Sequence, residues 1–557
     1  MDIHFLKIYT KEMKNIVKFL SLAVLGFAAA CSSPEKMAET TVVENIKVAC
    51  QPAVLEVVAG EINATVSVTY PKDYFHPQAI MQVIPVIVYE GGEVKMEPFK
   101  FQGEKVKDNY QVIPSTGATV SKKVKFEYVP GMEKSYLELR SVVTYKGKET
   151  NLPTVKVADG ANTTYMLVKK VGKVDYKPDN YQDIVPQTTE AQILYQINSS
   201  EVRNSEIRSN SIKEFKAALE EIKANERMNI VSTDIIAYAS PDGKEDENAK
   251  LSDNRSKSAE KVFGQLTRAT LAGTPVNVSS VGEDWEGFQE LVGASDLTDK
   301  NLIIRVLSMY SDPVVREQEI KNMSAVYKSL ADEVLPELRR ARFIANVEYA
   351  NYTSEELLAA IENNIDVLDE ESLLRAATLV NSNEEKVTVY QQAVKKYNSP
   401  RAQYNLAVTY ILMDKIAEAK KALEGLEQDP DWCNAMGTVA LHEGDLNAAA
   451  EYFAYSYTPS AIENASIIDI IDGEYAAAAA KLAGKNTYNA ALAQLLSGNP
   501  SAAAALTCEC PNVAYLRAIA AARKGDAAAV KSNLAIVAKN KDLAARAAKD
   551  IEFAQYR

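Results

Sequence analysis

Hydrophobic and polar residues alternate along the first third of the chain. Between residues 47 and 170, segments such as EINATVSVTYP and KKVKFEYVPG place β-branched and aromatic residues at about every second position, which is typical of strands with one buried face. Turn signals such as Glu90-Gly91-Gly92 and Pro130-Gly131 separate these segments. The pattern predicts an N-terminal all-β sandwich over residues 47–170. Polar residues and two prolines predict a linker over residues 171–189.

The pattern then changes to alternating strands and helices. It predicts a strand at Ile193–Ile197, a helix whose capping box pairs Ser211 with Glu214, and a second strand at Ile230–Ala239. The following sequence, SPDGKEDENAKLSDNR, predicts a turn and another helix. We therefore expect a central α+β domain over residues 190–350, divided by a helical insertion of roughly 50 residues.

The last third of the chain, residues 353–557, is rich in alanine and has the apolar spacing of amphipathic helices. Five stretches align on a helix-turn-helix step: ILMDKIAEAKKAL, ALHEGDLNAAAEYF, DIIDGEYAAAAAKL, QLLSGNPSAAAALT and AARKGDAAAVKSNL. Their turn residues are Asp414, Gly444, Gly473, Gly498 and Gly525. Each step leaves an apolar face open until the next step stacks on it, so the repeat predicts an all-α solenoid with a concave groove.

The N-terminal segment is typical of an export signal. Two lysines precede an apolar stretch, and three alanines come directly before Cys31. We interpret residues 1–31 as a signal peptide ending at this cysteine, and the small, polar and acidic residues 32–46 as a flexible tether. An ordinary signal peptide with a cysteine nearby is the alternative.

The sequence LGFAAAC resembles the lipobox of bacterial lipoproteins. The resemblance implies that Cys31 carries a diacylglycerol, that cleavage makes it the first mature residue, and that acyl chains such as palmitate anchor the protein in the outer membrane. Two or three acyl chains are enough for stable anchoring. Because the first acidic residue comes late after Cys31, we expect the periplasmic rather than the surface-exposed face.

The stretch from Ala237 to Ser256 resembles the OmpA-like periplasmic domain. The hallmark of that family is a strand, the turn G-H-T-D-x-x-G, and a helix that opens with Y-N-x-x-L-S-x-x-R-A. The residues that keep this register here are Gly243, Asn248, Leu251, Ser252 and Arg255. The segments ASPDG, GEDWEGF and PELRRAR together resemble a variant of this domain in Bacteroides-type envelope lipoproteins, and the C-terminal repeats resemble shortened tetratricopeptide repeats.

The resemblance implies a site for the diaminopimelate of peptidoglycan, formed by Ser240, Asp242, Asn248 and Arg255. In the family, an Asp holds the ligand ammonium and the Arg holds its carboxylate, and charge-assisted bonds suit such a zwitterion. Ser240 stands at the position of that Asp and offers no countercharge. Asp242 can replace it only if the turn directs its carboxylate inward.

Composition narrows the function classes. A net charge of −13 disfavours a general nucleic-acid binder. Beyond Cys31, the thiols are Cys50, Cys433, Cys508 and Cys510, without the spacing of a metal site, so we expect no metal. Cys433 either remains free or pairs with Cys508 or Cys510.

The sequence contains no phosphate loop, nucleophile elbow or zinc-protease motif, so we expect no enzyme and no cofactor. We expect an outer-membrane lipoprotein that acts as an envelope scaffold and binds an unidentified envelope protein through its repeats. The alternatives are a peptidoglycan-binding tether and a periplasmic chaperone. Ser240 favours the scaffold, because loss of a charged partner weakens a ligand grip.

Overall fold

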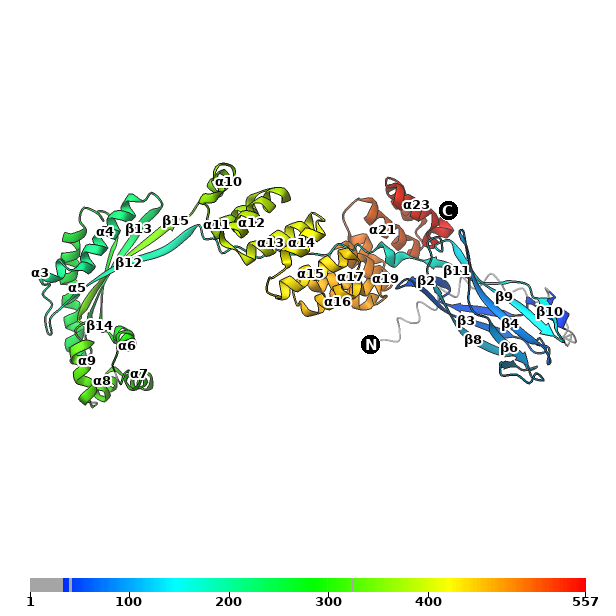
Figure 1. Ribbon diagram of the computed structural model, residues 1–557, viewed down its shortest axis with the longest axis horizontal. Helices are drawn as coiled ribbons and strands as arrows, with labels where there is room; N and C mark the ends of the chain where they lie inside the picture. The colour runs from blue at the N-terminus through cyan, green and yellow to red at the C-terminus, as the bar shows by residue number, and fades with distance from the viewer. Residues whose placement is uncertain (1–33, 40–42, 298, 323) are drawn as a thin grey trace. The chain divides into compact units, whose positions relative to one another are not determined.

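The computed structural model describes residues 34–39, 43–297, 299–322 and 324–557 (Figure 1). It divides into two compact units. Unit 1 combines the chain up to Tyr176 with Tyr410–Arg557, and unit 2 is Lys177–Thr409. Cys31 and the predicted signal peptide lie outside the described residues. Among the helices of the described ranges, none is both long and apolar enough to cross a membrane.

The N-terminal region is β-rich, as predicted. Its strands are β1 (Lys47–Gln51), β2 (Val54–Val58), β3 (Glu61–Tyr70), β4 (Ile80–Tyr89), β5 (Gly92–Lys95), β6 (Phe99–Gly103), β7 (Gln111–Ile113), β8 (Ala118–Glu127), β9 (Ser135–Tyr145), β10 (Lys148–Asn151) and β11 (Val155–Asn162). They pair in the order β1-β3-β2-β11-β9-β4-β6-β7, while β8 pairs with β3, β5 with β4 and β10 with β9. Every second residue of β3 is buried, which confirms the alternation read from the sequence.

The segment predicted as a flexible tether contributes to this core. Among its described residues, Pro34–Ala38 form a 3₁₀ helix, and Met37 is fully buried among the β-strand side chains. The prediction failed here because one apolar side chain in a polar stretch is sufficient to dock a short segment on a hydrophobic core.

The C-terminal region is helical, as predicted. Its helices are α10 (Ser354–Asn363), α11 (Glu370–Leu379), α12 (Asn383–Tyr397), α13 (Pro400–Leu412), α14 (Ile416–Leu423), α15 (Pro430–Glu443), α16 (Leu446–Tyr455), α17 (Pro459–Ile471), α18 (Tyr475–Lys481), α19 (Tyr488–Leu496), α20 (Ser501–Ala505), α21 (Pro511–Lys524), α22 (Ala527–Val537) and α23 (Lys541–Lys549). The five predicted turn residues all have left-handed backbone, with φ between 57° and 88°: Asp414, Gly444, Gly473, Gly498 and Gly525. This conformation suits glycine, which explains why four of the five are glycines.

Unit 1 joins the β region to the helices from Tyr410 onward in one hydrophobic core. The backbone N–H of Ala59 donates to the carbonyl of Ile471 at 3.2 Å. A Cβ added to Gly473 would lie 2.3 Å from the Val58 side chain. This grouping differs from the predicted boundaries, which assign all helices from 353 to a domain of their own.

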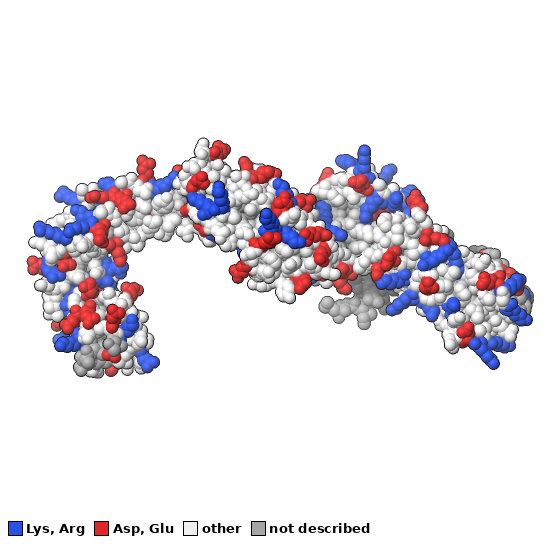
Figure 2. All heavy atoms as spheres, viewed as in Figure 1, with Lys and Arg blue, Asp and Glu red and all other residues white. Residues whose placement is uncertain are grey.

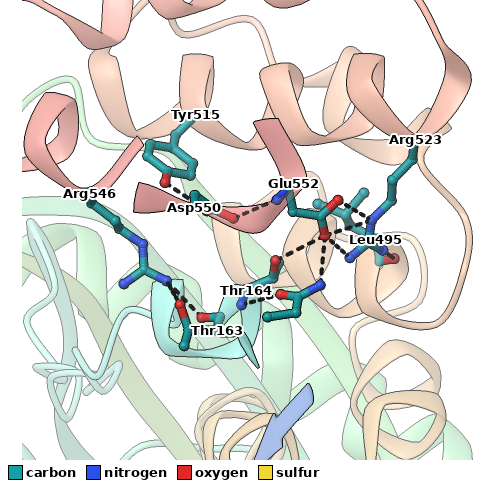
Figure 3. A network of polar contacts seen from close by, with 9 residues as sticks. Thr163, Thr164, Leu495, Tyr515, Arg523, Arg546, Asp550 and Glu552 are labelled. Carbon is teal, nitrogen blue, oxygen red and sulfur yellow. Dashed lines mark hydrogen bonds and ion pairs between the residues drawn. The ribbon is translucent and has the colours of Figure 1, made fainter. Parts of the chain in front are cut away.

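Glu552 is a polar connection between the two parts of unit 1 (Figure 3). Its carboxylate accepts hydrogen bonds from Asn162 Nδ2 at 2.9 Å and Thr164 Oγ1 at 3.2 Å, and it pairs with Arg523 at 2.6 Å. Its side chain is only 10% exposed, so these partners stabilise a largely desolvated charge. The β region and the last helices are therefore joined by specific polar contacts as well as by apolar packing.

Unit 2 contains a four-stranded sheet in the order β12-β15-β13-β14. The strands are β12 (Ile184–Leu194), β13 (Met228–Ala239), β14 (Val276–Glu283) and β15 (Arg340–Ala350). Strand β13 is parallel to β14 and antiparallel to β15, which is antiparallel to β12. Helices α3 (Asn204–Ile207), α4 (Asn210–Ala224) and α5 (Glu245–Thr267) belong to this α+β region.

Two local predictions in this region were wrong. Strand β12 begins at Ile184, inside the segment predicted as a linker, because β15 supplies its pairing along its whole length. Helix α4 is capped by Ser209, which accepts from the N–H of Ile212, whereas the hydroxyl of Ser211 accepts from the N–H of Gln192.

The predicted insertion lies between β14 and β15. It consists of α6 (Trp285–Ala294), α7 (Lys300–Met309), α8 (Pro313–Asn322) and α9 (Ser324–Glu333). A small separate core includes Phe288, Val292, Ile303 and Leu307. The insertion is thus a helical subdomain with its own apolar packing.

The four cysteines in the described part of the chain are free, so the alternative of a disulfide from Cys433 to Cys508 or Cys510 is wrong. Cys433 is buried in α15, whereas Cys508 is exposed.

On the face shown in Figure 2, Lys and Arg side chains are interspersed with Asp and Glu rather than gathered in a patch of one sign.

We predict that Gly473→Ala destabilises unit 1 more than Gly498→Ala does. Both replacements strain a left-handed backbone, which costs about 1 kcal/mol. Only Gly473 also faces Val58, and forced overpacking adds about 1–3 kcal/mol. Calorimetry of the full chain should show the larger drop in transition temperature for Gly473→Ala. Equal drops would contradict the shared core.

Candidate functional site

The predicted ligand turn lies where β13 ends and α5 begins. Ser240 is 4% exposed, and its hydroxyl donates to Asp242 Oδ1 at 2.5 Å. Arg339 closes the turn from the other side: its Nη2 lies 3.1 Å from Asp242 Oδ2, and its Nε donates to Ser240 Oγ at 3.3 Å. The carboxylate of Asp242 is thus directed inward, where it is already paired with a cation of the chain.

Asn248 supports the turn from helix α5. Its Nδ2 donates to the carbonyl of Ser240 at 3.2 Å and to Glu283 Oε1 at 2.9 Å. A Cβ on Gly243 would lie 3.0 Å from Asn248 Oδ1, so the glycine gives the amide room. Asn248 therefore holds the end of β13, the turn and the end of β14 together.

Arg255 is fully buried and donates to main-chain carbonyls. Its Nε, Nη1 and Nη2 donate to Ser199, Tyr238 and Gln196 at 3.0, 2.8 and 3.2 Å. The guanidinium also lies over the Tyr195 ring at 5.0 Å. Burial lowers the pKa of Arg255 to about 10, and the attraction of the Asp242 carboxylate offsets this desolvation only in part.

The structure thus brings Ser240, Asp242 and Asn248 together through hydrogen bonds and places Arg255 beneath them. The hydrogen-bonding groups of these side chains are paired with one another and with the adjacent main chain. Arg339, which lies in the PELRRAR segment, completes the arrangement, and the binding of diaminopimelate here stays a prediction.

A second arrangement involves the chain between η3 (Thr164–Leu167) and β12, which has no regular secondary structure from Val168 to Gln182. In unit 1, the side-chain amide of Asn464 in α17 forms hydrogen bonds with both main-chain polar groups of Lys173. Its Oδ1 accepts from the Lys173 N–H at 2.7 Å, and its Nδ2 donates to the Lys173 carbonyl at 2.8 Å. Asn434 of α15 donates to the same carbonyl at 3.0 Å.

The same double contact recurs four residues away. Asn489, at the start of α19, accepts from the N–H of Lys169 at 3.0 Å and donates to its carbonyl at 2.8 Å. Within unit 2, Asn405 of α13 makes the equivalent pair with Lys177, at 2.7 and 2.9 Å. Each asparagine amide therefore satisfies one residue of an extended backbone, as a neighbouring strand would.

Sequence reasoning missed these asparagines, although a signal was present. In two of the repeats an asparagine is followed four residues later by a threonine, as Asn405 and Thr409 in NLAVT and as Asn434 and Thr438 in NAMGT. All four residues are buried. Buried amides at matching positions in two repeats indicate a polar partner on these helices, since such groups require hydrogen-bond partners.

Among the described residues, no cluster of three or more His, Cys, Asp or Glu side chains could hold a metal ion.

Comparison with known proteins gives little. No known protein family matches the sequence. No curated protein matches it either. Among solved structures, the chain is similar to the native conformation of E. coli alpha-2-macroglobulin, at 10% identity and a TM-score of 0.11, over 81% of this chain and 25% of that one. The chain thus spans about a quarter of that protein.

We predict that Arg255→Met destabilises unit 2 by about 1–3 kcal/mol, because it leaves one buried and two partly buried carbonyls without donors. The matched control is Arg268→Met at the end of the same helix, where the arginine is exposed and the change should be within about 0.5 kcal/mol. Urea unfolding of the full chain measures both. If the two variants were equally stable, Arg255 would be available for a ligand.

Proposed function

We propose that the protein is a non-enzymatic lipoprotein scaffold of the bacterial envelope. It is anchored in the outer membrane through Cys31, and its C-terminal helices, which resemble tetratricopeptide repeats, bind extended protein segments. The observation that carries the proposal is the paired hydrogen bond between the Asn464 amide and the main chain of Lys173.

This contact supports a binding role for the helices. A side-chain amide that satisfies both an N–H and a carbonyl recognises extended backbone and does so with little regard to side-chain identity. The same contact recurs at Asn489 within unit 1 and at Asn405 within unit 2, which supports recognition of a linear segment in each unit. Because the chain's own segment occupies this surface, a partner protein binds elsewhere on the helices or displaces the segment.

The central domain is proposed to be a divergent OmpA-like domain near the cell wall. The order of strand, tight turn and helix around Ser240 agrees with the element order of that motif. The tether alternative is less well supported, because Asp242 is paired with Arg339 and Arg255 has no exposed surface.

The lipid anchor is tested by expression in a bacterial host with a clickable palmitate analogue. The wild-type chain should carry the label and sediment with the outer membrane, whereas Cys31→Ser should lose the label and remain in the soluble periplasmic fraction. Equal labelling of both chains would refute the anchor.

The choice between scaffold and tether is tested on isolated cell walls. For a scaffold, mild detergent should release the wild-type protein from sacculi as completely as it releases Cys31→Ser. Retention of both chains on detergent-washed sacculi would favour the tether instead.

A further inference from the structure

The segment from Val168 to Tyr176 lies against α15, α17 and α19, and its burial alternates from Val171 to Asp175. Gly172 and Val174 are buried, while Val171, Lys173 and Asp175 are exposed. This period of two belongs to an extended chain with one side against a surface. The segment is therefore seated on the helices as a peptide ligand would be, although it is part of the same chain.

Beyond the asparagine bonds to the backbone of this segment, the surface also restricts which residue can stand at position 172. A Cβ on Gly172 would lie 2.7 Å from Thr438 Cγ2 and 2.8 Å from its Oγ1, and Thr438 is fully buried. The backbone of Gly172 is not left-handed, so close approach rather than turn geometry requires the glycine here. Any larger residue at this position is excluded by the surface itself.

Charged side chains of the segment have partners as well. Lys169 Nζ lies 4.4 Å from the centre of the Tyr488 ring, a cation–π contact. The carboxylate of Asp175 accepts a hydrogen bond from the Ser460 hydroxyl. Lys173 Nζ lies 3.6 Å from Glu463, a weaker contact because the lysine is 53% exposed.

We propose that residues 168–176 are a built-in ligand of the helices of unit 1, and that the surface they fill is a selective site for an extended, basic segment with glycine at one fixed position. The inference rests on the proposed function in one respect only, namely that the helices bind protein segments. The inference adds which class of segment the helices recognise. It also adds which segment of this chain occupies the site. A competing partner must present a basic residue three positions before a glycine, as Lys169 precedes Gly172.

The proposal is tested by vacating the site without altering it. In full-length Gly172→Val, the added methyl groups meet Thr438, so the segment should leave the surface. Digestion with Lys-C should then cleave after Lys169 or Lys173 at least about tenfold faster than in the wild type, since each lost amide pair is worth about one power of ten. Gly172→Ala combined with Thr438→Ala restores the space, and protection should return.

In Gly172→Val, the vacated site can also be tested for binding of a separate peptide. A fluorescein-labelled peptide of residues 165–180 should bind the Gly172→Val chain but not the wild type, as measured by anisotropy. The peptide carrying valine at position 172 should bind neither chain, and adding Asn464→Ala to the Gly172→Val chain should weaken peptide binding about tenfold.

Two results would overturn the proposal. One is cleavage of the wild-type segment as fast as that of Gly172→Val, which would mean that the segment is not held. The other is release of the segment in Gly172→Val without any peptide binding, which would mean that the surface has no affinity of its own. Both measurements use purified protein, so their failure would leave the lipid-anchor result untouched.

Discussion

The structure depends on the need to satisfy the main-chain polar groups of an extended segment that lies against helices. Helices use their own N–H and carbonyl groups internally, so a chain crossing their inner faces finds no backbone partners there. Asn464 and Asn489 provide those partners from side chains. Without them, the polypeptide between the β region and β12 would lie against protein with unpaired groups, at a cost comparable to a lost hydrogen bond for each.

The turn at Ser240 shows the opposite use of polar side chains. There, Asp242 pairs with Arg339, Asn248 donates to the carbonyl of Ser240, and Arg255 donates to three main-chain carbonyls. In a zwitterion-binding site, at least one charge of each sign remains open to the ligand. The present arrangement stabilises the junction of β13 with α5, and its charges are already compensated within the chain or withdrawn from its surface.

Periodic features were predictable from the sequence, and single contacts were not. The alternation in β3 and the recurring turn at Gly444 reflect local geometry, which sequence patterns record directly. Strand β12 was partly missed, because an edge strand with polar residues resembles a linker until its partner β15 is known. The position of Ser240 in a turn between a strand and a helix was predictable from the local pattern, but its pairing with Arg339 depends on residues about a hundred positions apart. The asparagines were missed because their ligand, the segment around Lys173, is distant in sequence.

The contact between Asn162 and Glu552 spans 390 positions, and that between Lys169 and Asn489 spans 320. A nascent chain emerging from its amino end cannot form the first contact before residue 552 is synthesised, nor the second before α19 is synthesised, and loop closure over such distances is entropically costly and slow. During synthesis, the β region therefore passes through a stage in which the apolar surface later covered by α17 is bare. A premature stop codon before Pro459, where α17 begins, would make that exposed stage permanent, and its product would be a substrate for proteases.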